Sequence, residues 1–401
     1  MSTGTATASE QLGPATSTKG IIVHTLPEEQ RHLMELVEGL VADKIAPAAA
    51  QAERDEVFPR DLWDQLGAMD LAGLPFAQDV GGSALPYRTY LMVLEELSRG
   101  FAAFGLGLSV HTLVTVGIEK WATPAQRARF APDLTSGRML GGYCLSEPDA
   151  GSDAAALRCR AVRDGDVYRI TGTKAWVTHA GIADRYLVFA RTSDDGSRGI
   201  SAFVVDADQE GLTVAPKEDK MGLRASPTAQ LLFEDAPVPA DRLVGEQEGI
   251  GFKIAMSALD GGRLGVAAVA TGLAQASLDT ALSYARDREQ FKTPIIDFQG
   301  VSFMLADMAT QIEASRALYR SAADRLDHGH DVTKVASMSK LFATDMAMKV
   351  TTDAVQVLGG VGYTRDFPAE RYMREAKVMQ IFEGTNQIQR LVIGRTLAKG
   401  S

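Results

Sequence analysis

The order in which hydrophobic periodicities follow one another constrains the fold of this chain more than any other feature. Apolar residues recur at helical spacing up to about residue 138, and again in three long stripes after residue 252. Between these parts, short β-branched and aromatic runs alternate with glycine, aspartate and serine: VYRITGTKAWVT, RYLVFART, ISAFVVDAD and AQLLFED. No helical pattern separates these runs, which argues against a Rossmann unit.

This order predicts a multidomain α+β chain that is mostly α-helical. We expect an N-terminal helical domain at 26–138, a middle β-domain at 139–251 and a C-terminal helical bundle at 252–401, preceded by a flexible tail at 1–25. Within the first domain, Pro27 and the acidic residues after it predict the start of a helix, which Pro47 is expected to end.

The acidic composition limits the partners of the chain. A net charge of −10 disfavours nucleic acid and anionic membranes. No stretch is expected to reach the ~20 apolar residues that cross a bilayer. The first 20 residues lack the apolar core of a secretory signal, and Cys144 and Cys159 form no CxxC pair. These features favour a cytoplasmic protein with free thiols.

Several common motifs are missing from the sequence. It contains no GxGxxG after a predicted strand, no GxxxxGK[ST], no HExxH and no GxSxG. The sequence His328-Gly-His330-Asp331 lies where a helix is expected to end and is interpreted as a solvated turn. We therefore expect no metal site.

Two segments near the middle of the chain combine polar residues with glycine. In GGYCLSEPDAGSD, Ser146, Ser152 and backbone N–H groups either bind an anion or the edge of a polar ring, or only form a turn. In GTKAWVTHAG, Trp176 and Thr178 are two residues apart on a predicted strand and share a face. Trp176 is either the wall of a site for a flat ring or a core residue.

The C-terminal part contains further candidates. LDGGRLG is expected to open a helix with Asp260 as its N-cap, which puts Arg263 in the first turn. An arginine there opposes the helix dipole, so an outside partner is expected. In MQIFEGTNQIQR, Glu383 is either a solvated loop glutamate or a base whose pKa is raised by apolar surroundings.

Taken together, these segments closely resemble the acyl-CoA dehydrogenase family of flavoenzymes, from about residue 26 to 398. YCLSEPDAGSD resembles one signature of the family, and GGVGYTRDFPAERYMREAKVMQIFEGTNQIQR resembles the other. The resemblance implies a helical domain, a barrel-like β-domain and a four-helix bundle. It also implies FAD as cofactor, an acyl-CoA substrate, electron-transfer flavoprotein as acceptor and a homotetramer.

The resemblance assigns a role to each matching residue. Glu383 is implied to take the α-proton of the acyl-CoA while a hydride leaves the β-carbon for flavin N5, which gives a trans-2-enoyl-CoA. Some relatives carry the base at the position of Gly262, so here only Glu383 fits. The implied substrate contacts are Ser152, Asp260, Arg263 and Gly384. The implied FAD contacts are Tyr143, Leu145, Ser146, Gly151, Ser152, Trp176, Val177, Thr178, Arg288, Phe291, Gln299, Gln356, Leu358, Gly359, Gly360, Thr385 and Gln387.

Within that set, five residues are implied to reach the FAD of a neighbouring subunit: Arg288, Gln299, Gln356, Gly359 and Gly360. The sequence departs from the family pattern at Lys292, Val361 and Phe382, where a glycine, an asparagine or tyrosine, and a tyrosine are usual. Two alternatives share the fold. One is a flavin-dependent oxidase or monooxygenase, and the other is a non-catalytic binding subunit.

Overall fold

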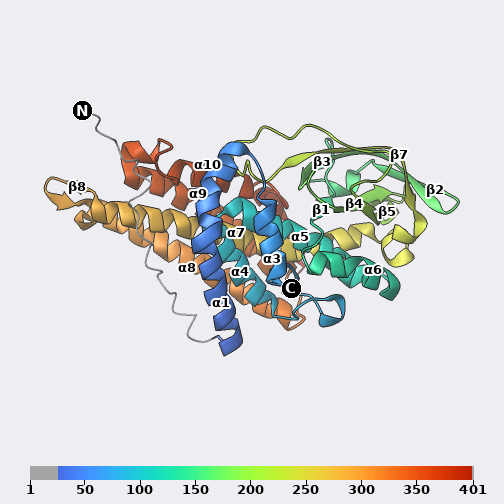
Figure 1. Cartoon of the computed structure of the whole chain (residues 1–401), viewed down its shortest axis with the longest axis horizontal. Coiled ribbons are helices and arrows are strands. Elements are labelled where there is room, and N and C mark those ends of the chain that lie inside the picture. The colour runs from blue at the N-terminus through green and yellow to red at the C-terminus, as the bar shows by residue number, and fades with distance from the viewer. Residues whose placement is uncertain (1–25, 400–401) are drawn as a thin grey trace.

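The computed structural model describes residues 26–399, so the tail predicted at 1–25 lies outside the described residues. Helices occupy both ends of the described chain and strands its middle, as Figure 1 shows. This confirms the predicted mostly helical α+β fold. The N-terminal helices are α1 (Glu28–Leu40), α2 (Ala46–Asp55), α3 (Arg60–Ala68), α4 (Tyr87–Gly100), α5 (Ala102–Trp121) and α6 (Pro124–Thr135). The C-terminal helices are α7 (Gly251–Asp287), α8 (Gln299–Asp327), α9 (Thr333–Leu358), α10 (Ala369–Met379) and α11 (Asn386–Ala398).

The middle of the chain forms one curled sheet with its own apolar core (Figure 1). Its strands follow the order β1-β4-β2-β3-β7-β6, and β5 pairs with the other edge of β4. Strands β1 and β2 run parallel to β4, whereas the remaining pairs are antiparallel. The bounds are β1 (Gly141–Cys144), β2 (Arg160–Asp164), β3 (Val167–Thr178), β4 (Arg185–Arg191), β5 (Ile200–Asp206), β6 (Leu212–Val214) and β7 (Thr228–Pro239).

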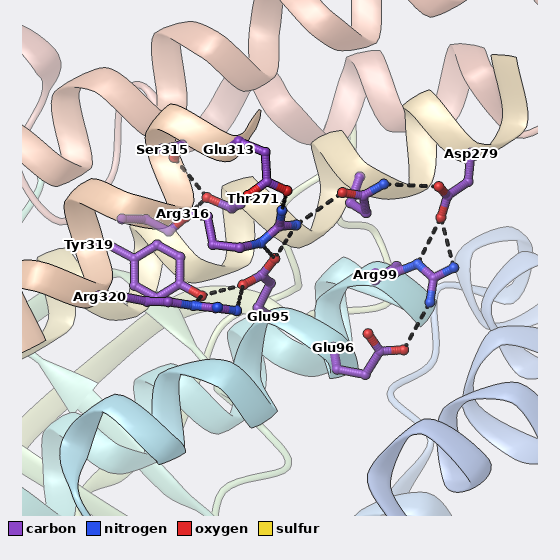
Figure 2. Close-up of polar contacts among 12 residues, drawn as sticks. Glu95, Glu96, Arg99, Thr271, Asp279, Glu313, Ser315, Arg316, Tyr319 and Arg320 are labelled. Atoms are coloured by element: carbon purple, nitrogen blue, oxygen red, sulfur yellow. Dashed lines mark hydrogen bonds and ion pairs between the residues drawn. The ribbon is translucent and has the colours of Figure 1, made fainter. Parts of the chain in front are cut away.

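The N- and C-terminal helices share one hydrophobic core, which fixes α4 and α5 against α7. The approach of α4 to α7 is close, because a Cβ atom on Gly272 would lie 2.1 Å from the carbonyl oxygen of Glu95. At this contact α4 also buries polar side chains against α8. Figure 2 shows Glu95 of α4 facing Arg316, Tyr319 and Arg320 of α8.

Two helix boundaries differ from the prediction. Pro47 does not end a helix, because α1 continues through a π-helical turn at Val41–Ile45 into α2, where Pro47 lies in the first turn. The π-helical turn directly before Pro47 changes the local hydrogen bonding, so the helix continues past a residue that has no N–H to donate. Likewise, α7 begins at Gly251, so Asp260 lies inside this helix and is not its N-cap.

Helix α5 also corrects an expectation. The helix has 20 residues and contains an apolar window with a mean hydropathy of 1.4, so by length and composition alone it could cross a membrane. The prediction that no stretch reaches this length and apolarity was therefore wrong. However, 89% of its apolar window is buried inside the protein. We interpret α5 as a core helix that packs against α4, α7 and β1.

Candidate active site

Glu383 lies in the short loop between α10 and α11. Its backbone is left-handed, with φ of 50°, and Gly384 follows with φ of 88°. Thr385 caps α11 by accepting a hydrogen bond from the N–H of Ile388 at 3.2 Å. Both carboxylate oxygens of Glu383 are buried, and neither has a hydrogen-bond partner among residues 26–399. A solvated loop glutamate would not have this environment.

The environment of Glu383 changes its acidity. Burial raises the pKa of the carboxyl to about 7, while the charges of Lys340 and Arg263 act in the opposite direction. A buried carboxyl with a pKa near neutrality and no partner is suited to accept a proton from a bound ligand. The geometry therefore favours the base over the alternative of a solvated glutamate.

Helices α4, α5 and α7 approach Glu383 from the core side. A Cβ atom on Gly262 of α7 would lie 2.3 Å from Oε2 of Glu383 and 2.7 Å from Cδ2 of Leu113 on α5. Tyr87 and Tyr90 of α4 have ring centroids 5.1 Å apart. Burial raises the pKa of both tyrosines, and the charge of Glu383 adds to this effect. The base is thus surrounded by aromatic and apolar groups.

Because any side chain at position 262 would meet the Glu383 carboxylate, we expect that the active enzyme requires glycine there. Gly262→Ala should displace the Glu383 carboxylate and lower the rate of the reaction it serves by about 100-fold, since a shift of about 1 Å is enough for that. Single-turnover kinetics would measure the loss. Gly39→Ala on α1 is the matched control, because a Cβ there meets nothing within 4 Å. A Gly262→Ala enzyme with the normal rate would contradict the assignment.

The β-domain presents Trp176 to solvent on β3. This side chain is 62% exposed, and its backbone has φ of 59° at an irregularity in the pairing of β3 with β7. A strained, exposed tryptophan is not a core residue, and strain of this kind is typical of ligand sites. Val177 beside it is buried and Thr178 half-buried. Of the two alternatives, the exposure of Trp176 therefore favours the wall for a flat ring over a core residue.

A buried ion pair fixes the neighbouring segment beside Trp176. Nζ of Lys174 lies 2.7 Å from Oε1 of Glu147 and donates to the carbonyl of Leu145 at 3.2 Å. The N–H of Ala175 donates to the carbonyl of Ser146 at 2.9 Å. Leu145 and Ser146 are thereby held against β3. Tyr143 of β1 reaches α7 through a 3.3 Å hydrogen bond to the carbonyl of Ala255.

These contacts test whether the residues fit a flavin. An exposed aromatic ring, half-buried hydroxyl groups and the glycine- and serine-containing turn at 146–152 suit a flat ring with polar edges. The charge of Glu383 reaches Tyr143 and raises its pKa, although burial has the larger effect. The residues of the β-domain wall therefore fit FAD.

The other predicted FAD contacts are not brought to this wall. Arg288 precedes the hairpin of β8 (Glu289–Gln290) and β9 (Thr293–Pro294), where Phe291 is 90% exposed. Figure 1 shows this hairpin projecting at the opposite end of the molecule from the β-domain. Gln299 opens α8 there. Since α9 returns antiparallel to α8, its C-terminal residues lie toward the same end: Gln356, Leu358, Gly359 and Gly360.

The predicted substrate residues of α7 have partners within the chain. Arg263 is buried and donates to Oδ1 of Asp260 at 2.6 Å, while Thr333 donates to Oδ2 of Asp260 at 3.0 Å. The expected outside partner of Arg263 was inferred from a first-turn position. That reasoning was wrong, because α7 begins 12 residues earlier, at Gly251. Of the remaining predicted contacts, Gly151, Ser152 and Gln387 are exposed.

Sequence reasoning missed three buried side chains that hold the Glu383 loop. Lys340 donates to the carbonyl of Gly384 at 2.9 Å and to Oδ1 of Asn386 at 2.8 Å. Gln389 donates to the same carbonyl at 2.9 Å. A signal existed, because Lys340 interrupts the buried alanine face of α9 at helical spacing. Among residues 26–399, no group of three His, Cys, Asp or Glu side chains could hold a metal ion.

Comparison with known proteins identifies similar chains. Three family models match, namely the N-terminal, middle and C-terminal domains of acyl-CoA dehydrogenase, at residues 27–138, 142–236 and 249–398. An acyl-CoA dehydrogenase of Bacillus subtilis is 45% identical over 93% of this chain and 99% of its own length. The mitochondrial short-chain specific acyl-CoA dehydrogenase of Bos taurus is 42% identical over 93% of this chain and 91% of its own.

Solved structures agree with these relatives. Butyryl-CoA dehydrogenase from Megasphaera elsdenii has a TM-score of 0.91 at 40% identity, covering 93% of this chain and 99% of its own. A chain from a study of the electron transferring flavoprotein of Acidaminococcus fermentans has a TM-score of 0.91 at 42% identity, covering 93% and 98%. The FAD complex of PigA has a TM-score of 0.89 at 27% identity, covering 94% and 99%.

Proposed function

Since the chain belongs to the acyl-CoA dehydrogenase family, we propose that it catalyses the α,β-dehydrogenation of an acyl-CoA thioester to a trans-2-enoyl-CoA, with Glu383 as the base. The observation that carries this proposal is the buried Glu383 carboxylate, which has no partner among residues 26–399 and lies against Gly262. A carboxylate side chain at position 262 would occupy the same space as the Glu383 carboxylate, whereas glycine leaves that space free for Glu383.

The cofactor is FAD, as in the family to which the chain belongs. The chemistry it supplies when bound is acceptance of a hydride at N5 of the flavin ring. Trp176, Leu145 and Ser146 would hold the flavin on the β-domain side. The loop at 383–384 would hold the thioester on the other side.

The protein groups must make the α-proton of the thioester acidic enough to leave. Hydrogen bonds to the thioester carbonyl stabilise the negative charge that develops as the proton moves to Glu383. Among residues 26–399, the backbone N–H of Glu383 has no acceptor, so it is available to the carbonyl. Because water is excluded from the buried carboxylate, the hydrogen bond to the thioester carbonyl is stronger and the carboxylate is more basic.

The pH dependence follows from the state of the base. Glu383 must be ionised to accept a proton, and burial raises its pKa to about 7. The second-order rate constant of flavin reduction, measured at acyl-CoA concentrations well below saturation, should therefore rise roughly tenfold per pH unit below about pH 7 and level off above it. Stopped-flow absorbance between pH 5.5 and 9 would measure this limb. A flat profile across this range would argue against a base with a raised pKa.

An anaerobic titration tests the proposed reaction directly. The FAD-loaded protein should be yellow, and its flavin absorbance should bleach when acyl-CoA is added. We propose short acyl groups as substrates, because the relatives include short-chain and butyryl enzymes. The series should run from butyryl-CoA to palmitoyl-CoA and include branched forms. If none bleaches a fully loaded flavin, the proposal fails.

The electron acceptor distinguishes the enzyme classes. We propose electron-transfer flavoprotein, because a chain from a study of that partner is among the similar structures. With acyl-CoA and oxygen alone, little peroxide should form, and adding electron-transfer flavoprotein should restore turnover. Peroxide released in step with substrate consumption would instead indicate the oxidase alternative. A binding subunit would show neither reaction, and the presence of Glu383 argues against it.

We also propose a homotetramer in which FAD lies between subunits. The two groups of implied FAD contacts lie at opposite ends of one chain, so a second copy would bring the hairpin around Phe291 to the β-domain wall (Figure 1). Light scattering of the FAD-loaded protein should give a tetramer. A monomer that retains FAD would contradict the shared site. The cytoplasmic location and a role in fatty-acid β-oxidation also stay predictions.

A further inference from the structure

A buried lysine stands beside the proposed base without a role in the scheme above. Lys340 of α9 is fully buried, and its Nζ donates to the carbonyl of Gly384 at 2.9 Å and to Oδ1 of Asn386 at 2.8 Å. An ammonium group away from water is costly unless hydrogen bonds or opposite charges compensate it. The position of Lys340 therefore needs an explanation.

The hydrogen bonds of Lys340 belong to a clamp on the Glu383 loop. Asn386 is itself fixed, because its Nδ2 donates to Oγ1 of Thr344 at 2.9 Å and to Oδ1 of Asp345 at 2.8 Å. Lys340 thus ties the residue after the base to the rigid helix α9. Glu383 has the left-handed φ of 50°, which is strained in a residue with a side chain. A fixed loop compensates this strain.

Lys340 also carries one of two positive charges that act on Glu383. The second is Arg263 of α7, but Arg263 is paired with Asp260 at 2.6 Å. The direct hydrogen-bond partners of Lys340 are a carbonyl and an amide, and the carboxylate of Asp345 acts on it at longer range. The other groups around Glu383 are tyrosines that burial keeps neutral, namely Tyr87 and Tyr90 of α4 and Tyr143 of β1.

We propose that Lys340 is a positioning residue of this active site. It holds the loop through Gly384 and Asn386, and its charge stabilises the ionised form of the Glu383 carboxyl. This inference rests on the proposed function of Glu383 as the base. Burial lowers the pKa of Lys340 to about 7, against the effect of Glu383 and Asp345. The two groups therefore titrate in the same range, and each charge favours the other.

Variants of Lys340 test both parts of the inference in the FAD-loaded protein. Lys340→Met removes the charge and the hydrogen bonds. We expect flavin reduction by butyryl-CoA to slow by about 10- to 100-fold because the base is misplaced. Without the positive charge, the carboxyl of Glu383 is harder to ionise, so the acid limb of the pH profile should move upward by about one pH unit. Lys340→Gln keeps a hydrogen-bond donor and should show the same shift with a smaller loss of rate.

A second readout does not depend on turnover. The carboxylic acid C=O stretch of Glu383, identified by infrared difference spectroscopy against Glu383→Gln, should persist to higher pH in both Lys340 variants. Gln389→Met is the matched control, because Gln389 donates to the same Gly384 carbonyl at 2.9 Å but carries no charge. It should lower the rate without moving the acid limb or the infrared titration.

Each outcome decides the matter. If Lys340→Gln reacts at the normal rate with an unshifted titration, the inference is wrong. If the Lys340 and Gln389 variants lose rate but share the wild-type titration, Lys340 has only a structural role, which also overturns it. Failure of the proposed function looks different, because the wild-type flavin would then not be bleached by butyryl-CoA or any other acyl-CoA.

Discussion

Replacing Glu383 by glutamine is expected to slow flavin reduction by acyl-CoA by roughly 10²- to 10⁴-fold, the usual contribution of a general base. Glutamine has the size of glutamate and fits the same cavity, but its amide cannot accept the α-proton. FAD should stay bound, because neither carboxylate oxygen has a hydrogen-bond partner among residues 26–399 and the implied flavin wall lies on the β-domain. Anaerobic stopped-flow absorbance measures the rate, and the visible spectrum measures the FAD content.

A second buried glutamate supplies the matched control for this experiment. Glu375 lies on α10, eight positions before Glu383, and is 1% exposed. Burial raises its pKa to about 8, so near pH 7 its carboxyl is mostly neutral. Glu375→Gln should therefore leave flavin reduction within a few-fold of wild type. If Glu383→Gln bleaches as fast as wild type, Glu383 is not the base.

The sequence alone predicted the parts of the fold that carry long periodic patterns. Helices α7, α8 and α9 and strands β3, β4, β5 and β7 were expected from periods of 3.6 and 2. Strands β1, β2 and β6 were not, because each has only three to five residues, too few for alternation to be recognised. Their positions depend on pairing with β3, β4 and β7 rather than on their own sequences.

The errors at α7 and α5 arise because tertiary packing, which the sequence does not display, decides the environment of both helices. Asp260 was expected to cap a helix that starts there, but α7 runs through the pair Gly261-Gly262, although glycine costs about 1 kcal/mol per residue inside a helix. In the fold, a Cβ on Gly261 would lie 2.9 Å from Oη of Tyr87, and one on Gly262 would meet Glu383. Tertiary packing thus requires the glycines and also supports the helix. Similarly, only the packed structure shows that the apolar α5 is surrounded by protein.

For the site, the sequence provided the residue types and the structure provided their environments. Glu383 could be selected from motifs, but its raised pKa depends on burial by helices far away in sequence. The bond from Lys340 to Gly384 joins positions 44 residues apart, and no local pattern encodes such a contact. For Trp176, the neighbouring residues in sequence allowed either a core or a ligand-facing role. Only its exposure in the structure excludes the core.

The second large effect is expected on stability, at the contact between α4 and α8. Glu95 accepts hydrogen bonds from Nε of Arg316 at 2.8 Å and from the hydroxyl of Tyr319, and Nη2 of Arg320 lies 3.3 Å away (Figure 2). The side chains of Glu95, Arg316 and Arg320 are only 9–11% exposed. Burial acts to raise the pKa of Glu95, but the two arginines and these hydrogen bonds hold it below its usual range.

Glu95→Ala should therefore destabilise the protein by about 3–5 kcal/mol, because it leaves buried guanidinium groups without their carboxylate. A lower urea midpoint of unfolding measures the loss. Glu313→Ala is the matched control: Glu313 pairs with the same Arg316 but is 59% exposed, so its removal should cost about 1 kcal/mol or less. The difference between wild type and Glu95→Ala should shrink in acid, because a carboxyl with a lowered pKa stabilises the fold only while it is ionised. Equal losses in the two variants would show that burial does not govern the strength of this network.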